Sequence, residues 1–225
     1  MSNRCLRIAP HRSLRSLTLL LLAASLVPVE ARAQSGDRDA WQRVPEVMAG
    51  LAIGTGSRVA DVGAGSGYFT THLAGEVGAD GSVFAVEISE RELSRLRRLA
   101  EDESLENIEV VRGEVDDPSL PELSMDAVLV VDAYHEMTEH AAMLDAIYRA
   151  LKPGGRLVIL DFVPADGSAS RDQQTASHRI SIDLVDLEVQ AAGFKVLDRD
   201  PQFTRTGGGR GQWMLVARRP VRAGS

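Results

Sequence analysis

The sequence predicts a single α/β domain, a doubly wound and mostly parallel sheet of seven strands with helices on both faces. Short aliphatic runs alternate with helical stretches from Asp37 to the end of the chain, the order in which strands and crossover helices build a parallel sheet. Aromatic residues are only 4% of the chain, which suits a sheet core made of aliphatic side chains. A glycine-rich segment, residues 63–67, joins the first predicted strand to its helix.

The predicted strands are short aliphatic runs bounded by turn-forming or charged residues. They comprise residues 58–62, 82–87, 108–112, 126–131, 156–161, 194–199 and 212–217. Pro153, Gly154 and Gly155 are expected to end the connection that precedes the fifth strand. Three glycines at 207–209 are expected to form the turn between the last two strands.

Apolar residues at helical spacing predict five helices. They comprise residues 39–51, 68–77, 89–100, 138–151 and 181–192. Pro45 is expected to break the first helix or to start a new one. Ser89 and Glu92 have the spacing of a capping box at the third helix. Thr138 is expected to cap the fourth helix, and Gly193 is expected to close the last one.

Residues 1–33 are expected to lie outside the fold and to form a cleavable export signal. Basic residues without an acidic one precede an apolar run at 17–29, and Ala31 and Ala33 give the small-x-small pattern of a cleavage site. Thirteen helical residues span only ~20 Å, less than the ~30 Å core of a bilayer. We therefore expect cleavage near Ala33, general secretion to the periplasm and a domain at 34–225 without stable membrane insertion. A retained interfacial anchor is the alternative.

Charge and cysteine content exclude several function classes. The formal net charge is −7, and it is more negative without residues 1–33, which hold five basic residues and one acidic residue. Such a domain repels phosphate backbones, so we expect no nucleic acid partner. The single cysteine, Cys5, lies in the export signal, so the domain has no disulfide and no thiolate nucleophile. The sequence does not indicate the oligomeric state.

The glycine-rich loop has the pattern G-x-G-x-G at Gly63, Gly65 and Gly67. Glycines let the backbone turn tightly and approach a ligand near a helix N-terminus. A dinucleotide fingerprint would place a small residue where Tyr68 stands, which disfavours NAD. Glu87 ends the second strand, where a carboxylate can accept hydrogen bonds from a ribose diol. A plain tight turn and a solvated strand-end charge are the alternative interpretations.

Three motifs, in order, resemble class I S-adenosylmethionine-dependent methyltransferases over residues 59–162. They are VADVGAGSGYFT at 59–70, the acid Glu87, and LKPGGRL at 151–157. The chain especially resembles the small-molecule branch that includes ubiquinone/menaquinone-biosynthesis and arsenite methyltransferases. It implies a Rossmann-like fold, S-adenosyl-L-methionine as cofactor and in-line methyl transfer to a small molecule. The arsenite enzymes use cysteine ligands, which the domain lacks, so arsenic methylation is not expected.

The resemblance also implies which residues bind the cofactor. These are Asp61, Gly63, Ala64, Gly65, Gly67, Glu87, Ile88, Glu114 and Asp132. Asp61 and the loop backbone would hold the methionine part, Glu87 the ribose hydroxyls and Ile88 the adenine. Glu114 is one methylene longer than the Asp usual at its position, and Asp116 is the reserve candidate for that contact. Asp132 would line the methionine end.

Candidate catalytic residues follow the fourth strand, at the sheet edge where ligands of open α/β sheets bind. His135 could take a proton from an acceptor hydroxyl, because an imidazole titrates near neutral pH. Its alternative is a structural role, as a helix cap or as a partner of a backbone carbonyl. Tyr134 could orient the acceptor or stack on it, with Glu136 as a supporting residue.

His178 and Arg179 precede the last predicted helix, in a linker that covers the pocket in the enzymes that the chain resembles, so the resemblance implies a substrate contact there. We expect no metal site, since neighbours such as His135 and Glu136 should point in different directions. S-adenosylmethionine is made in the cytoplasm, so an exported, non-catalytic module that binds it or another nucleoside is the alternative to an enzyme. A nicotinamide oxidoreductase is a third hypothesis, disfavoured by Tyr68.

Overall fold

The computed structural model describes residues 38–204 and 211–221. The predicted export signal and the predicted glycine turn at 207–209 lie outside these ranges. Among the helices within them, none combines the length and the apolar character needed to cross a membrane.

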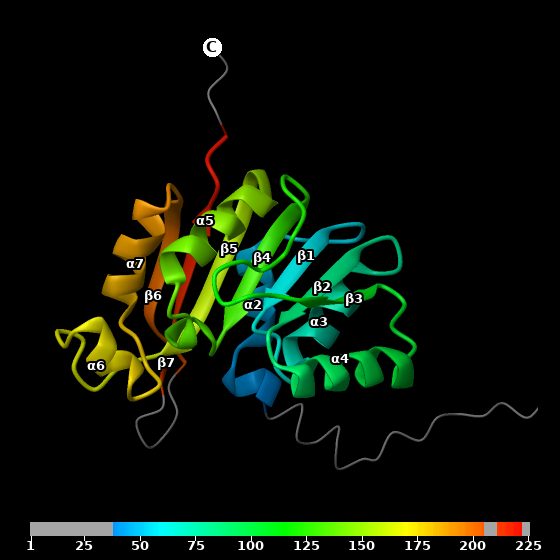
Figure 1. Cartoon of the computed structure of the whole chain (residues 1–225). Coiled ribbons are helices and arrows are strands. Elements are labelled where there is room, and N and C mark those ends of the chain that lie inside the picture. Colours follow the sequence, from blue (N-terminus) through cyan, green and yellow to red (C-terminus); the bar gives the residue numbers. More distant parts are fainter. Residues whose placement is uncertain (1–37, 205–210, 222–225) are drawn as a thin grey trace, which may run out of the picture.

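Seven strands form one sheet in the order β3-β2-β1-β4-β5-β7-β6 (Figure 1). Their bounds are β1 Arg58–Val62, β2 Ser82–Glu87, β3 Ile108–Arg112, β4 Met125–Val131, β5 Leu151–Phe162, β6 Lys195–Thr204 and β7 Gln212–Arg218. All neighbours pair in parallel except β7, which is antiparallel to both β5 and β6. The predicted mostly parallel, seven-stranded sheet is therefore confirmed.

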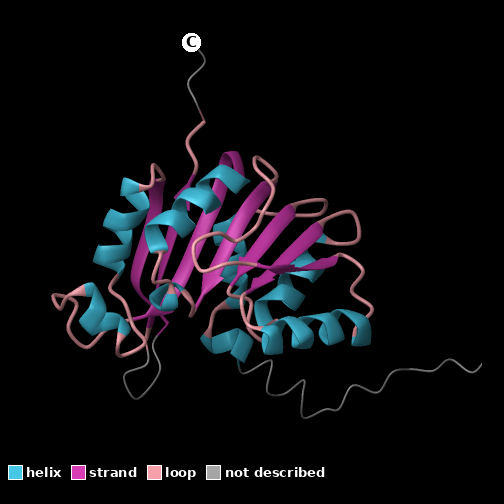
Figure 2. Ribbon diagram, viewed as in Figure 1, coloured by secondary structure: helices cyan, strands magenta, loops and turns pink. Residues whose placement is uncertain are grey.

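Helices cover both faces of the sheet (Figure 2). Their bounds are α2 Val44–Leu51, α3 Tyr68–Val77, α4 Glu90–Asp102, α5 His140–Ala150, α6 Arg171–Thr175 and α7 Ile182–Ala191. Alternate strand residues point to opposite faces, so Ala60 of β1 packs in the core with α5 and α7 while Val59 packs in the core with α2 and α3. This alternation gives the doubly wound arrangement that the aliphatic runs predicted.

Several predicted helix starts and ends are confirmed. Pro45 lies in the first turn of α2, after Arg43 in a left-handed conformation, so the predicted interruption is present. Ser181 caps α7 by accepting a hydrogen bond from the Leu184 N–H. Gly193 follows α7 with φ of 92°, a conformation that glycine adopts without a steric penalty.

The predicted capping box of α4 and the predicted cap of α5 are wrong. Ser89 is the N-cap residue of α4, but its side chain makes no capping hydrogen bond. Glu92 pairs instead with Arg95 on the exposed face of the same helix. Thr138 does not cap α5, which begins at His140 after Glu139. A short 3-10 turn, η1 at Tyr134–Glu136, uses part of the segment between β4 and α5.

Two further segments differ from the prediction. β5 begins at Leu151, so the Pro-Gly-Gly motif lies within the strand, opposite an irregularity in β4 between Met125 and Ala127. The segment 163–180, expected as a linker, contains helix α6. That helix starts with a capping box in which Ser170 and Gln173 satisfy each other's backbone N–H groups. The Ser170–Gln173 spacing was the sequence signal that could have revealed it.

Candidate functional site

A pocket of about 260 Å³ opens at the carboxyl ends of β1, β2 and β4, where the parallel strands end. Its wall is formed by the β1–α3 loop, the end of β2, the segment after β3 and the segment from β4 to α5. The wall residues are Val62, Gly63, Gly65, Val86, Glu87, Ile88, Gly113, Glu114, Val115, Asp132, Ala133, Glu136, Met137, Thr138 and Met143. Six of the predicted cofactor residues are among them.

Gly63 and Gly65 of the β1–α3 loop are required to be glycine for different structural reasons. A Cβ at Gly63 would lie 2.5 Å from the Cβ of Ala133, so only glycine lets this loop approach the end of β4. A Cβ at Gly65 would meet nothing within 4 Å, because this residue borders the open pocket. Both residues have positive φ, which favours glycine. The loop therefore presents bare backbone to the pocket.

Glu87 fixes this loop to the end of β2. Its Oε1 accepts a hydrogen bond of 2.8 Å from the Gly65 N–H, and its Oε2 accepts one of 3.0 Å from the Ile88 N–H. The carboxylate is thus held on the pocket wall with acceptor capacity left for further donors. Ile88 beside it is 53% exposed, an apolar side chain at the pocket edge.

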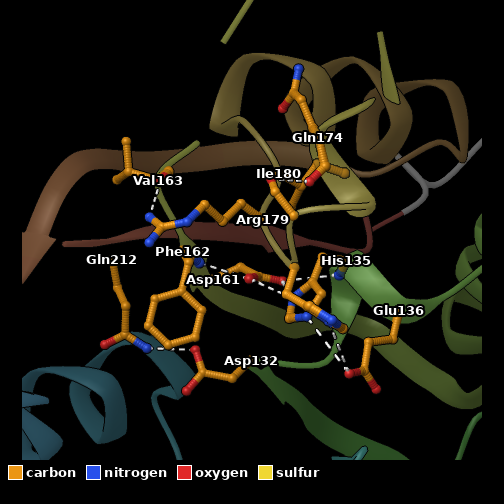
Figure 3. Close-up of polar contacts among 12 residues, drawn as sticks. Asp132, His135, Glu136, Asp161, Phe162, Val163, Gln174, Arg179, Ile180 and Gln212 are labelled. Atoms are coloured by element: carbon orange, nitrogen blue, oxygen red, sulfur yellow. Dashed lines mark hydrogen bonds and ion pairs between the residues drawn. The ribbon is translucent and has the colours of Figure 1, made fainter. Parts of the chain in front are cut away.

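Asp132 is on the pocket wall directly after β4, the neighbour of β1 on the side away from β2. Its Oδ1 accepts a hydrogen bond of 2.6 Å from Nε2 of Gln212 (Figure 3). Burial raises the pKa of Asp132 to about 6, although the hydrogen bond from Gln212 lowers it. Gln212 is fully buried and was missed by the sequence analysis, because it comes from β7, which is far from Asp132 in the chain.

The remaining predicted cofactor residues lie off the pocket wall. Asp61 is buried and accepts a hydrogen bond of 2.7 Å from the Thr70 hydroxyl, and burial raises its pKa to about 6. Ala64 packs in a small core cluster with Leu96 of α4. Gly67 faces α4, where an added Cβ would lie 2.4 Å from a methyl group of Leu99. Cofactor contacts by these three residues remain predictions, as does the reserve role of Asp116.

His135 is buried against a carboxylate. Its Nδ1 lies 2.8 Å from Oδ1 of Asp161, and its backbone N–H donates to Oδ2 of the same residue (Figure 3). Burial lowers the pKa of His135, but the hydrogen bond and charge of Asp161, with the charges of Glu136 and Asp132, raise it above its ordinary value. Because the carboxylate accepts, we assign the proton to Nδ1, which leaves the lone pair on Nε2. Asp161 was missed because it lies inside an aliphatic run.

Tyr134 occupies the face of the sheet covered by α7. It is fully buried, and its hydroxyl donates a hydrogen bond of 2.7 Å to Oε2 of Glu188. Arg171 of α6 donates to the other oxygen of Glu188, at 2.9 Å. Tyr134 therefore links η1 to α6 and α7 and does not line the pocket. Its side chain packs in the core, and its contact with an acceptor stays a prediction.

His178 and Glu136 meet His135 at one end of the site. Glu136 Oε1 lies 3.7 Å from Nε2 of His135 and 3.8 Å from Nδ1 of His178, and the two imidazole rings are edge to face at 5.7 Å. The expectation that His135 and Glu136 point apart is therefore wrong: the tight turn of η1 brings both side chains to one place. Arg179 instead donates to the Val163 carbonyl at 2.6 Å.

Residues 59–155 match the model of a family described as "Methyltransferase domain". This part of the chain is similar to a methyltransferase domain. The chain is 28% identical to an arsenite methyltransferase of Halobacterium salinarum over 169 residues, which are 72% of this chain and 43% of that protein. It is 29% identical to a demethylmenaquinone methyltransferase of Listeria welshimeri, covering 54% of this chain and 50% of that protein. The chain thus spans about half the length of the curated relatives it matches.

Solved structures share the fold of this chain beyond the residues that match the family model. An S-adenosylmethionine-dependent methyltransferase from Aquifex aeolicus superposes with a TM-score of 0.67 at 22% identity, covering 83% of this chain and 97% of that one. The sheet order, the glycine loop and the family match together identify the class I S-adenosylmethionine-dependent methyltransferase fold.

Proposed function

We propose that this protein transfers a methyl group from S-adenosylmethionine to a small molecule. The observation that carries the proposal is the position of Glu87, whose carboxylate lies on the pocket wall next to the exposed backbone of Gly65. A carboxylate with acceptor capacity left, beside a loop without side chains, is an arrangement that suits a ribose diol, because the hydroxyls can donate to the carboxylate and the loop lets the sugar approach closely.

The residues on the wall offer groups that suit the successive parts of this cofactor. Glu87 has acceptor capacity for a ribose diol, and the exposed Ile88 offers an apolar surface to a base. Gly65 leaves open space that a side chain would fill. Asp132, after β4, and Glu114, after β3, add polar groups to the wall. When bound, S-adenosylmethionine supplies an electrophilic methyl group on a sulfonium, so the protein supplies alignment of the acceptor and, for a weak nucleophile, a base.

The acceptor is proposed to bind at the end formed by η1 and His178. Glu136 belongs to the pocket wall and also approaches both His135 and His178, so this end adjoins the cofactor site. The predicted role of His135 as the group that takes the acceptor's proton would use Nε2, because Nδ1 faces Asp161. Arg179 would act through the backbone it holds at Val163 and not by direct contact.

A small-molecule acceptor agrees with the charge of the chain. The formal net charge of −7 disfavours a nucleic acid as the acceptor. The composition of residues 1–33 further supports the proposal that the domain works in the periplasm after export.

The proposal is tested by titrating S-adenosylmethionine and its demethylated product into the purified full chain by calorimetry. We expect both to bind in the micromolar range. Methyl-labelled cofactor is then incubated with the small-molecule fraction of a cell extract, and we expect label to enter a low-molecular-weight product. Binding without label transfer would favour a non-catalytic module, and absence of binding by either ligand would overturn the proposal.

A further inference from the structure

Two imidazoles and one carboxylate converge beside the pocket. The ligand atoms of His135, Glu136 and His178 all lie within 4.8 Å of one another. The carboxylate is central, since its Oε1 is the atom that approaches both rings. Glu136 and His178 are exposed, whereas the side chain of His135 is only 4% exposed. One ligand is thus fixed by the core, and two are free to adjust.

Asp161 orients the fixed ligand. It lies 2.8 Å from Nδ1 of His135, is fully buried, and also accepts hydrogen bonds from the backbone N–H groups of His135 and Phe162 (Figure 3). A carboxylate on one imidazole nitrogen fixes the tautomer and directs the lone pair of the other nitrogen outward, as in metal-ligating histidines. Within residues 38–204 and 211–221, no hydrogen-bond donor is assigned to Nε2 of His135, which faces Glu136.

The segment that carries His178 is held in place by α6. The His178 N–H donates to the carbonyl of Thr175 at 2.9 Å. The buried side chain of Gln174 donates to the Ala169 carbonyl and accepts from the Ser181 N–H, both at 2.7 Å. The loop is therefore tied down on both sides of His178, and the imidazole reaches the cluster from a defined backbone position.

The distances require only side-chain adjustment to form a metal site. Zinc–nitrogen and zinc–oxygen bonds are about 2.1 Å, which in a tetrahedral site places ligand atoms roughly 3.4 Å apart. The observed separations of 3.7 and 3.8 Å to Glu136 are slightly longer than this. Because Glu136 and His178 are exposed, rotation about their side-chain bonds can close the difference without disturbing the core.

We propose that His135, Glu136 and His178 bind one divalent transition-metal ion of the Zn²⁺ class. Imidazole nitrogen suits such ions, whereas Mg²⁺ and Ca²⁺ prefer oxygen-only ligand sets. Three protein ligands leave at least one coordination position open, as in catalytic zinc sites. An ion on Nε2 of His135 would occupy the lone pair that a general base uses, so the two roles of this atom exclude each other.

The proposed ion would help to bind the methyl acceptor, and this role rests on the proposed methyl transfer. Glu136 lines the cofactor pocket, so the ion would be bound beside the proposed acceptor end. An acceptor that offers an anionic oxygen could bind there, because a metal ion stabilises the ionised form of an oxygen ligand. The substrate class is then a small molecule with a metal-coordinating oxygen next to the atom that is methylated.

The site is tested by calorimetric titration of Zn²⁺ alone into the metal-stripped full chain, purified without a metal-affinity tag. We expect one ion per chain, and Co²⁺ in its place should give the visible absorption of a coordinated ion. His178→Ala should abolish saturable binding, and Glu136→Gln should weaken it by more than about tenfold. Glu139→Gln, the same change at an exposed residue outside the cluster, should bind like the unchanged protein.

Two outcomes overturn the metal site: no saturable binding to the unchanged chain, or binding to Glu136→Gln and His178→Ala that is as tight as binding to the unchanged chain. Asp161→Asn should weaken binding by about 10- to 100-fold if the carboxylate orients His135. The titration contains neither cofactor nor acceptor, so its failure leaves the proposed methyl transfer standing. Conversely, failure to bind S-adenosylmethionine leaves the metal site standing.

Discussion

Glu87 holds the glycine loop through a hydrogen bond of 2.8 Å from the Gly65 N–H to its Oε1, across 22 residues of sequence. The bond joins the end of β2 to the loop after β1, two neighbouring parallel strands. One carboxylate therefore positions the backbone of the pocket and also presents an acceptor to a ligand. The pocket is preorganised before any ligand binds, which reduces the entropy lost on binding.

Glu87→Gln is expected to weaken S-adenosylmethionine binding by roughly 10- to 100-fold, since hydrogen bonds to a charged acceptor contribute about 1.5–3 kcal/mol. The amide can still accept from the Gly65 N–H, so the loop should keep its shape. Calorimetric titration measures the change. Glu109→Gln, at an exposed position of β3, is the control and should leave the affinity unchanged. Equal affinity in the two variants would show that Glu87 does not contribute to cofactor binding.

Gly65→Arg is expected to abolish cofactor binding, because the side chain would enter the open space beside the pocket. Gly56→Arg is a matched control: Gly56 also has positive φ and open surroundings, and it lies off the pocket wall. Both variants carry the backbone strain of a side chain at positive φ, so the midpoint temperature of thermal unfolding should fall by a similar amount in both. Calorimetry should detect binding only in the Gly56 variant. Full affinity in the Gly65 variant would mean that the cofactor binds elsewhere.

The pH dependence of stability should reveal Asp61. Burial raises its pKa from 3.8 to about 6, with Thr70 lowering it and the charge of Glu87 raising it. The folded state therefore binds the proton more tightly than the unfolded state, so this contribution to the free energy of unfolding is complete below about pH 4 and is lost as pH rises through about 6.

Asp61→Asn removes that titration, and the free energy of unfolding of the variant should vary less than that of the unchanged chain across this pH window. Urea unfolding at a series of pH values measures it. Asp80→Asn, in an exposed turn, should retain the original pH profile. An unaltered profile for Asp61→Asn would show that Asp61 is not the titrating group.

Tyr134→Phe is expected to lower the free energy of unfolding by about 1 kcal/mol, the usual value of one hydrogen bond. The variant loses the bond from the Tyr134 hydroxyl to Glu188, while Arg171 still pairs with that carboxylate. Cofactor affinity should not change, since Tyr134 is fully buried away from the pocket wall. Tyr148→Phe is the control, because the Tyr148 hydroxyl makes no hydrogen bond within residues 38–204 and 211–221. Loss of turnover at unchanged stability would restore the predicted catalytic role of Tyr134.

The regular elements near the pocket could be predicted because their signals are local. The bounds of β1, β2, β3 and α3 agree with the aliphatic runs and turn residues that predicted them. The errors arose where local signals compete with packing. Ser89 and Glu92 have capping-box spacing, yet Glu92 pairs with Arg95 instead. The Pro-Gly-Gly motif in β5 resembles a turn, but its residues extend the strand.

The sequence by itself determined the sheet, the glycine loop and the acid at the end of β2, because each depends on residues close together in the chain. Only the tertiary structure decided the partners of the site. Asp161 is 26 residues from His135, Glu188 is 54 from Tyr134, and Gln212 is 80 from Asp132. These contacts depend on the order β4-β5-β7 and on how α6 and α7 pack beside η1. Sequence periodicity does not predict these contacts. The partner of a single buried polar residue in an aliphatic strand can be identified only once the pairing of the strands is known.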